Sequence, residues 1–179
     1  MSKEASDNKQ QIRSEMRQRL RNLSAEEKKA ASQNIREQIS RLSLTSCAIF
    51  AGTSTEPDLL ILLKDHPEIK WFLPRVNSTS KGEMEFIKIN SQTELKKGAY
   101  GILEPSGQPT SSDKIETIIC PGIAFTKNGS RLGQGGGFYD RHLSKAPHIK
   151  TIGAFFNCQL VDDLPSEQHD IQMSQILFA

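Results

Sequence analysis

The chain has 179 residues and an almost balanced charge, with 23 basic against 21 acidic side chains and a net charge of +2. This length suits one domain with a complete apolar core. The charge balance argues against a nucleic-acid-binding protein, which concentrates basic charge on one face. We also expect neither a signal peptide nor a membrane span, because the N-terminus is polar and no long apolar run follows it.

The cysteines Cys47, Cys120 and Cys158 are odd in number and widely spaced, without the spacing of metal ligands. Each lies in an apolar stretch, which is typical of small core residues in a reducing compartment. The alternative is a nucleophilic Cys120, but no histidine lies near it in the sequence. We therefore expect core thiols and a cytoplasmic location.

The N-terminal third predicts two helices. Residues 1–8 are polar and are expected to form a flexible tail, followed by one domain over residues 9–179. Apolar residues recur every four positions from Lys9 to about Arg21 and predict an amphipathic helix. Ser24, followed by Glu27, predicts a capping box that begins a second helix ending near Leu42.

Strands and helices alternate through the remaining sequence. Strands are expected at 47–51, 71–73 (ended by Pro74), 84–89, 117–120, 151–155 and 175–178. Helices are expected at 58–64 and 139–144, with a polar loop at 106–113. This alternation indicates an α/β protein with a largely parallel sheet covered on both faces. Because such sheets bind ligands beyond the carboxyl ends of their strands, we expect the loops at 52–57 and 121–140 to face one crevice.

The most informative segment is glycine-rich: five of the twelve glycines fall between Gly129 and Gly137, just before a predicted helix. Glycines let backbone N–H groups approach a ligand closely, and a helix start favours anions. Arg131 and Arg141 add positive charge, and Asp140 is placed to hold the Mg²⁺ that accompanies a phosphate. The segment matches neither the P-loop nor the dinucleotide fingerprint. The alternative interpretation is a purely structural turn.

The segment from Arg131 to Asp140, with Pro-Gly-Ile-Ala-Phe at 121–125 before it, resembles the signature of the 5-formyltetrahydrofolate cyclo-ligase family, whose members are also called 5,10-methenyltetrahydrofolate synthetases. Weaker matching pieces occur in the family's order at Lys9 and Arg13 and at 55–58, 73–76, 101–105 and 164–170. The resemblance implies a three-layer α/β fold with helices on both faces of the sheet, similar to sugar-isomerase and CoA-transferase folds.

The resemblance also implies a reaction: the ATP- and Mg²⁺-dependent cyclisation of 5-formyltetrahydrofolate to 5,10-methenyltetrahydrofolate, with release of ADP and phosphate. The formyl oxygen is a poor leaving group, so the implied route phosphorylates it first. The implied partners are ATP and the folate, the implied cofactor is Mg²⁺, and the protein is expected to be a monomer that binds neither nucleic acid nor membranes.

The resemblance assigns roles to individual positions. The residues implied to act on the phosphates are Lys9, Arg13 and Arg131. Those implied to bind ATP are Lys9, Arg13, Arg131, Leu132, Gly133, Gln134, Gly135, Gly136, Gly137, Phe138 and Tyr139. Those implied to bind the folate are Ala51, Glu56, Gln134, Gly135, Gly136, Gly137 and Phe138. The implied metal ligands are Asp140 and Asp170.

The residues themselves leave alternatives open. Lys9 and Arg13, four positions apart, form either an anion site or a solvated basic face, and Arg17 extends that face without an assigned role. Taken alone, Glu56 is typical of a solvent-facing residue and Asp170 of a surface residue or helix cap.

Three positions depart from the family pattern. Gln134 stands where an aromatic or basic residue is common, Phe138 replaces a common tyrosine, and Gly136 stands where some relatives have lysine. These departures leave a second hypothesis, a non-catalytic module that binds a folate or a phosphorylated ligand on the same fold. A third, a sugar-phosphate isomerase or CoA-transferase, lacks a clear acid–base constellation.

Overall fold

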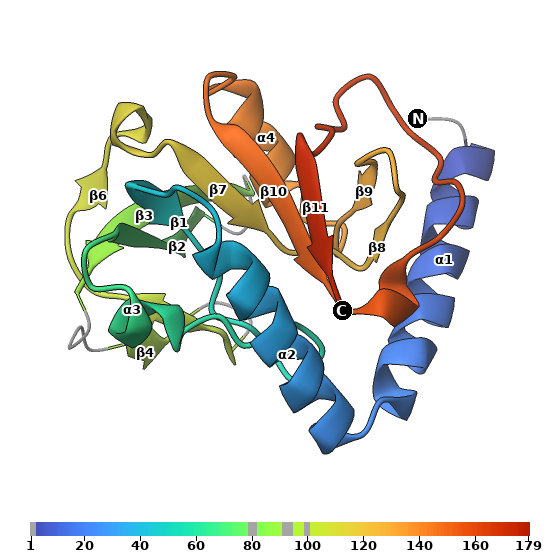
Figure 1. Cartoon of the computed structure of the whole chain (residues 1–179). Helices are drawn as coiled ribbons and strands as arrows, with labels where there is room; N and C mark the ends of the chain where they lie inside the picture. The colour runs from blue at the N-terminus through green and yellow to red at the C-terminus, as the bar shows by residue number, and fades with distance from the viewer. Residues whose placement is uncertain (1–2, 79–81, 91–94, 99–100) are drawn as a thin grey trace.

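The structure is a computed structural model that describes residues 3–78, 82–90, 95–98 and 101–179 (Figure 1). It has four α-helices in these ranges: α1 (Lys3–Asn22), α2 (Ala25–Ser40), α3 (Leu62–Asp65) and α4 (Phe138–Ser144). The structure also has the 3-10 turns η2 (Ser112–Lys114) and η3 (Asn157–Gln159).

Helix α1 begins earlier than predicted. Residues 3–8, expected to be a flexible tail, form its first turns because neither glycine nor proline interrupts the helix there. The four-residue stripe is confirmed, since Met16 and Leu20 are each 1 % exposed. The predicted capping box of α2 is confirmed as well: the hydroxyl of Ser24 accepts from the Glu27 N–H at 3.1 Å, and the Glu27 carboxylate accepts from the Ser24 N–H at 2.8 Å.

A central seven-stranded sheet has the order β11-β10-β7-β1-β2-β3-β6. The strands from β11 to β2 are parallel to their neighbours, whereas β3 and β6 pair antiparallel at one edge. The strand bounds are β1 Ser46–Ala48, β2 Lys70–Ser78, β3 Glu83–Ile89, β6 Pro109–Thr110, β7 Thr117–Cys120, β10 Lys150–Phe155 and β11 Gln175–Phe178. The largely parallel sheet is therefore confirmed, and part of the loop expected at 106–113 is instead its edge strand.

Two short antiparallel ribbons lie beside this sheet. One joins β4 (Leu95–Lys97) to β5 (Leu103–Pro105), and the other joins β8 (Ala124–Phe125) to β9 (Arg131–Leu132). The second ribbon carries the start of the glycine-rich segment, so that segment leaves a strand and enters α4.

Strand β2 continues through Pro74, where we predicted its end. The Phe72 carbonyl accepts from the Ile49 N–H at 2.9 Å and so faces β1. In a strand, the N–H groups of every second residue point to the same neighbouring strand, so the position where Pro74 lacks an N–H also faces β1. The last residue pair between β1 and β2 lies before Pro74, so the proline costs no hydrogen bond between the two strands. The next N–H on that side, of Val76, donates to the Glu104 carboxylate at 3.2 Å.

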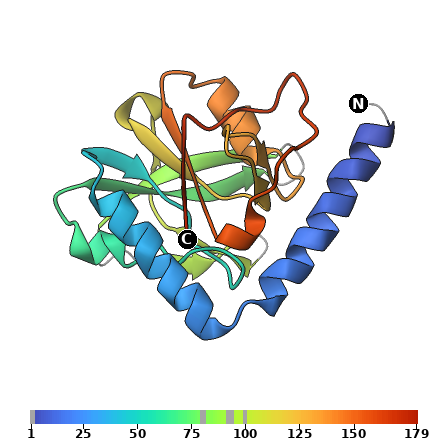
Figure 2. The same cartoon turned by 45° about the vertical axis from the view of Figure 1, so that its right-hand side comes forward.

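The sheet separates two apolar clusters, as a three-layer fold requires. Alternate residues of one strand enter different clusters: Cys47 belongs to the cluster that includes residues of α1 and α2, and Ala48 to the cluster that includes Leu143 of α4. Helix α2 therefore covers one face and α4 the other, whereas α1 lies against η3 and β8 at the side of the sheet (Figures 1 and 2). In the described part of the chain, no helix combines the length and apolar character needed to cross a membrane.

Candidate active site

A pocket of about 600 Å³ opens beyond the carboxyl ends of β1 and β7. Its walls come from the loop after β1, the loop after β7, the glycine-rich segment and the first turn of α4. The predicted crevice is thus confirmed, because residues of 52–57 and of 121–140 line the same cavity. The remaining wall comes from α1, β2, β3 and the β4–β5 ribbon.

The predicted site residues divide into two groups. Those that line the pocket are Ala51, Glu56, Arg131, Gly133, Gln134, Gly136, Gly137, Phe138, Tyr139 and Asp140. Those outside its lining are Lys9, Arg13, Leu132, Gly135 and Asp170. Among the second group, the Leu132 side chain is buried in the core and its carbonyl accepts from the Ile123 N–H at 2.7 Å.

The glycine-rich loop adopts the backbone that its sequence suggests. Gly135 has φ 109° and Gly137, which precedes α4, has φ 64°, both in the region that favours glycine. In the described residues, no backbone hydrogen bond uses the N–H groups of Gly133, Gln134, Gly135 or Gly136. The loop therefore offers free donors beside the pocket. Helix α4 has only 7 residues, so its dipole is a weak anion-binding feature. The free N–H groups of the loop are better placed to bind an anion than the helix start that the sequence suggested.

Arg131 forms the charged floor of the pocket. Its side chain is 3 % exposed, and Nη2 donates to Asp140 Oδ1 at 2.7 Å while Nη1 donates to the Pro121 carbonyl at 3.2 Å. The guanidinium carbon lies 5.7 Å from the centre of the Tyr139 ring. Burial raises the pKa of Tyr139 well above its ordinary range and keeps the phenol neutral. Among the described residues, the buried Nε of Arg131 finds no hydrogen-bond partner.

Asp140 has one oxygen bound and one available. Oδ1 accepts from Arg131 and also from the Ile171 N–H at 3.3 Å. Oδ2 accepts no hydrogen bond from the residues that the structure describes, and the side chain is 18 % exposed at the pocket wall. One free carboxylate oxygen beside phosphate-binding groups fits Mg²⁺, which needs only one or two carboxylates when substrate phosphates and water complete its shell.

Lys9 and Asp170, predicted for different ligands, bind each other. Lys9 Nζ donates to Asp170 Oδ2 at 2.8 Å and to Glu167 Oε2 at 2.9 Å. Burial lowers the pKa of Lys9, but the hydrogen bonds to the two carboxylates outweigh it and the net pKa is raised. Burial likewise opposes ionisation of Asp170, yet the Lys9 hydrogen bond holds the pKa of that carboxyl below its usual range. The solvated basic face considered for Lys9 is therefore wrong, because Lys9 is 7 % exposed.

Asp170 belongs to a small acidic group in the loop before β11. In the described ranges, Glu167, His169 and Asp170 are the one set of three metal-ligating side chains whose ligand atoms lie within 4.8 Å of one another. Two of the three already bind Lys9. Glu167 was not predicted from the sequence, because its partner lies 158 residues away.

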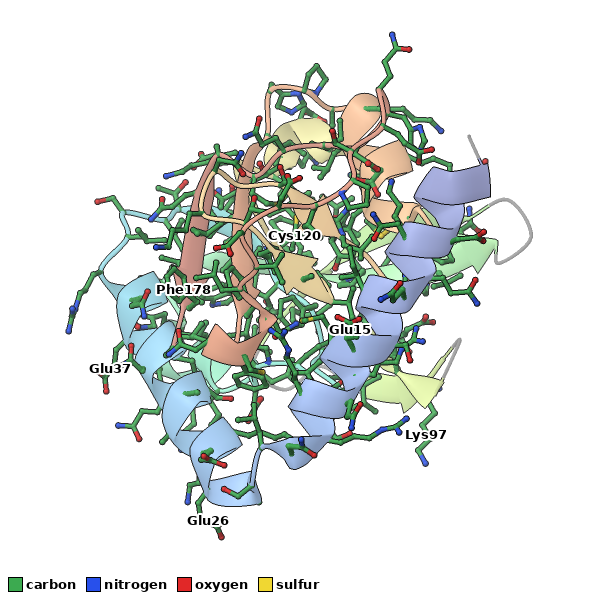
Figure 3. All side chains as sticks on the ribbon, turned by 90° about the vertical axis from the view of Figure 1, so that its right-hand side faces the viewer. Glu15, Glu26, Glu37, Lys97, Cys120 and Phe178 are labelled. Carbon is green, nitrogen blue, oxygen red and sulfur yellow. The ribbon has the colours of Figure 1, made fainter. Side chains whose placement is uncertain are left out.

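Helix α1 contacts the glycine-rich loop through two arginines, and Figure 3 faces this helix. Arg13 Nε donates to the Gly133 carbonyl at 2.9 Å, and Arg17 Nη2 donates to Gln134 Oε1 at 3.2 Å. Arg17 lines the pocket although it received no role from the sequence. Its four-residue spacing from Arg13 was the available signal, since both lie on one helical face.

Glu56 is held in place by its own loop. Its Oε2 accepts from the Thr53 N–H and from the Thr53 hydroxyl, both at 3.0 Å. The side chain is half-buried and lines the pocket. Two other lining residues, Met84 and Glu104, come from β3 and β5 and were missed, because nothing local in the sequence connects these strands with the glycine-rich loop.

Comparison with known proteins matches this arrangement to one family. The family model described as "5-formyltetrahydrofolate cyclo-ligase family" covers residues 5–179. The 5-formyltetrahydrofolate cyclo-ligase of Haemophilus influenzae is 31 % identical over 94 % of this chain and 96 % of its own, and the mouse protein of that name is 29 % identical over 95 % and 93 %.

Solved structures are also similar. The 5,10-methenyltetrahydrofolate synthetase of Aquifex aeolicus matches with a TM-score of 0.84 and 28 % identity over 95 % of this chain and 89 % of that one. The Mycoplasma pneumoniae synthetase, 23 % identical with a TM-score of 0.74 over 94 % and 97 % of the two chains, shows the same fold. The sequence match spans nearly the whole length and the fold agrees, so the chain belongs to the 5-formyltetrahydrofolate cyclo-ligase family.

Proposed function

We propose that this protein is an enzyme that cyclises 5-formyltetrahydrofolate to 5,10-methenyltetrahydrofolate at the expense of ATP. The observation that carries the proposal is one pocket that gathers the buried Arg131–Asp140 pair, the glycine-rich loop and the carboxylate of Glu56. A cation, free N–H donors and a carboxylate suit phosphates at one end and an N–H-rich ring at the other. Membership of the family supports the same assignment.

The phosphate end is formed by the glycine-rich loop and Arg131. We infer that the free N–H groups of Gly133 to Gly136 and the unpartnered Nε of Arg131 bind phosphate oxygens. Arg13, fixed on the Gly133 carbonyl, adds a positive charge above the loop. Phosphoryl transfer depends mainly on position and charge neutralisation, so these groups need not form a covalent bond with the substrate.

The folate end is formed by Glu56 and apolar side chains. The carboxylate of Glu56 can accept two adjacent N–H groups from the edge of a pterin ring. Phe138 and Met84 line the same pocket and offer flat or adaptable apolar surface to that ring. Phe138 stacks as a tyrosine would but cannot donate a hydrogen bond.

The chemistry proceeds in two steps in this proposal. The formyl oxygen attacks the terminal phosphorus of ATP, and the bond to the bridging oxygen breaks to release ADP. The nitrogen at position 10 then attacks the activated formyl carbon and releases its proton to solvent, and the carbon–oxygen bond breaks so that inorganic phosphate leaves with that oxygen. The role of the protein is to align the two substrates and to exclude water from the phosphorylated formyl group.

Mg²⁺ fits this site through Asp140, whose Oδ2 is available beside Arg131. When bound, the metal neutralises charge on the phosphate oxygens. Asp170 stays a second predicted ligand, although its Oδ2 accepts from Lys9 and from the Glu167 N–H in this structure. Lys9 in turn stays a predicted phosphate-binding residue. To bind a phosphate, it must give up one of its ion pairs with Glu167 and Asp170.

The test is a turnover assay with purified protein, ATP, Mg²⁺ and 5-formyltetrahydrofolate. The absorbance of the methenyl product reports cyclisation, and a coupled assay measures ADP in equal amount. If both substrates bind but no product forms over a range of pH and Mg²⁺ concentration, the hypothesis of a non-catalytic module is correct instead.

We further propose that the protein acts as a cytoplasmic monomer, independently of nucleic acid and membranes, with residues 9–179 in one domain. Sedimentation at working concentration tests the oligomeric state.

A further inference from the structure

We propose that Arg17 binds the carboxylate end of the folate substrate and so determines which way the substrate enters the pocket. The proposal depends on the folate-binding function proposed above. It names a binding residue that neither the sequence pattern nor that function assigned.

Arg17 has the position that this role needs. It projects from α1 into the pocket lining while its side chain stays exposed to solvent, as expected at a pocket mouth. Its Nη2 donates to Gln134 Oε1 at 3.2 Å, which fixes the guanidinium against the glycine-rich loop. The partner is a neutral amide, so the positive charge of Arg17 is not cancelled by it. A planar guanidinium with further donors binds a carboxylate through two parallel hydrogen bonds.

The charges of the other lining residues restrict where a carboxylate can bind. Among the lining residues that the structure describes, Arg131 is the other cation, and it is committed to Asp140 at 2.7 Å. The acidic lining residues are Glu56, Glu104 and Asp140. Negative charges repel a carboxylate strongly where water is scarce, so these three side chains disfavour binding of the carboxylate end of the folate beside them. Of the two lining cations, Arg17 is therefore the one that remains to bind a carboxylate.

The basic residues Lys9, Arg13 and Arg17 of α1 have different surroundings, which distinguishes the role of Arg17 from phosphate binding. Lys9 reaches Glu167 and Asp170, and Arg13 reaches the Gly133 carbonyl, whereas Arg17, one turn further on, lines the pocket. A substrate carboxylate and an ATP phosphate share the chemistry that Arg17 recognises. The experiment must therefore distinguish these two anions.

The decisive comparison uses two substrates and two variants. One substrate is 5-formyltetrahydrofolate, and the other is the same pterin with its glutamate replaced by methylamine, which removes both tail carboxylates. Arg17→Ala should lower kcat/KM for the folate roughly tenfold through a higher KM, and leave the neutral analogue unchanged. The wild-type protein should prefer the folate by a similar factor. Arg21→Ala, one turn along α1 and outside the pocket lining, is the matched control and should change neither value.

Two further variants refine the test. Arg17→Lys keeps the charge but loses the planar fork, so it should restore part of the preference for the folate. Gln134→Glu places a carboxylate beside Arg17 and should mimic Arg17→Ala. Equal losses on both substrates in Arg17→Ala, or a higher KM for ATP with an unchanged KM for the folate, would overturn the proposal.

Calorimetric binding of both compounds separates this proposal from the function on which it rests. Absence of turnover in the wild type would contradict the catalytic function alone. Tighter binding of the folate than of the analogue, abolished in Arg17→Ala, would still support the carboxylate contact. Equal binding of both compounds by the wild type would refute it.

Discussion

Arg131 and Asp140 bind each other at 2.7 Å, although each is expected to hold a different part of the nucleotide complex. Arg131 is suited to phosphate oxygens and Asp140 to the metal. In the free protein the two charges neutralise one another at the pocket floor, where the arginine is 3 % exposed. The ligands must therefore compete with this pair, and the two residues can be separated only by testing nucleotide and metal dependence independently.

We expect Arg131→Ala to weaken ATP binding about tenfold or more, because a charge-assisted hydrogen bond in a buried site contributes roughly 1.5–3 kcal/mol. The exposed Lys29→Ala on α2 is the control and should bind ATP as the wild type does. Calorimetry at fixed Mg²⁺ measures both. Wild-type affinity in Arg131→Ala would remove this residue from the phosphate site.

Asp140→Asn should raise the Mg²⁺ concentration needed for turnover and leave folate binding nearly unchanged. Asparagine keeps the size and an acceptor for Arg131, but loses the charge that the metal requires. A Mg²⁺ titration of activity, with calorimetric folate binding alongside, checks this. A normal Mg²⁺ dependence combined with lost folate binding would show that the carboxylate serves the folate instead.

Gly135→Val should reduce ATP affinity at every Mg²⁺ concentration. Its φ of 109° is costly for a branched side chain, by roughly 1–3 kcal/mol, and the added atoms would obstruct the loop N–H groups. Gly107→Ala, at φ 133° away from the pocket, carries similar strain and should lower stability without affecting ATP binding. If both variants reduce ATP affinity equally, strain alone explains the loss.

Lys9→Met should destabilise the protein at neutral pH and much less in acid. The pKa values of Glu167 and Asp170 are lowered in the fold from their ordinary 4.5 and 3.8. The two carboxylates therefore contribute to folding stability at pH values above 4.5 and 3.8. It is lost as the pH falls through the lowered pKa values. Lys9, with a pKa raised above 10.5, contributes below that pH and loses its contribution as the pH rises further. The melting temperatures of the wild type and the variant should therefore differ most near neutral pH and converge at strongly acidic and strongly alkaline pH. A difference that stays constant with pH would mean that the ion pairs contribute little to stability.

The thiols should be unreactive in the native protein, with Cys158 as the exception. Cys47 and Cys120 are each 0 % exposed, and burial raises the pKa of Cys120 to about 12, which excludes a thiolate nucleophile near neutral pH. Cys158 is half-buried. A thiol reagent should label at most one cysteine in native buffer and three in denaturant. Rapid labelling of two or more native thiols would contradict the burial of the core.

Local residue patterns were sufficient for several features of this protein. Apolar spacing predicts α1 and the core strands, Ser24 and Glu27 predict the start of α2, and the glycines predict a loop that needs positive φ at Gly135. Each of these depends on residues a few positions apart. The family resemblance supplied the ligands, because no physical rule converts the spacing of glycines into a folate.

Tertiary structure decided the partners of the charged groups. Lys9 meets Glu167 across 158 positions, and Arg17 meets Gln134 across 117. Such contacts arise from how α1 packs against η3 and β8, and nothing near either residue in the sequence specifies them. Pro74 shows the same limit, since a proline that ends a strand in most surroundings is tolerated here because its neighbour β1 has already stopped. The chain therefore encodes its elements locally, whereas the pairing of its charges depends on the whole fold.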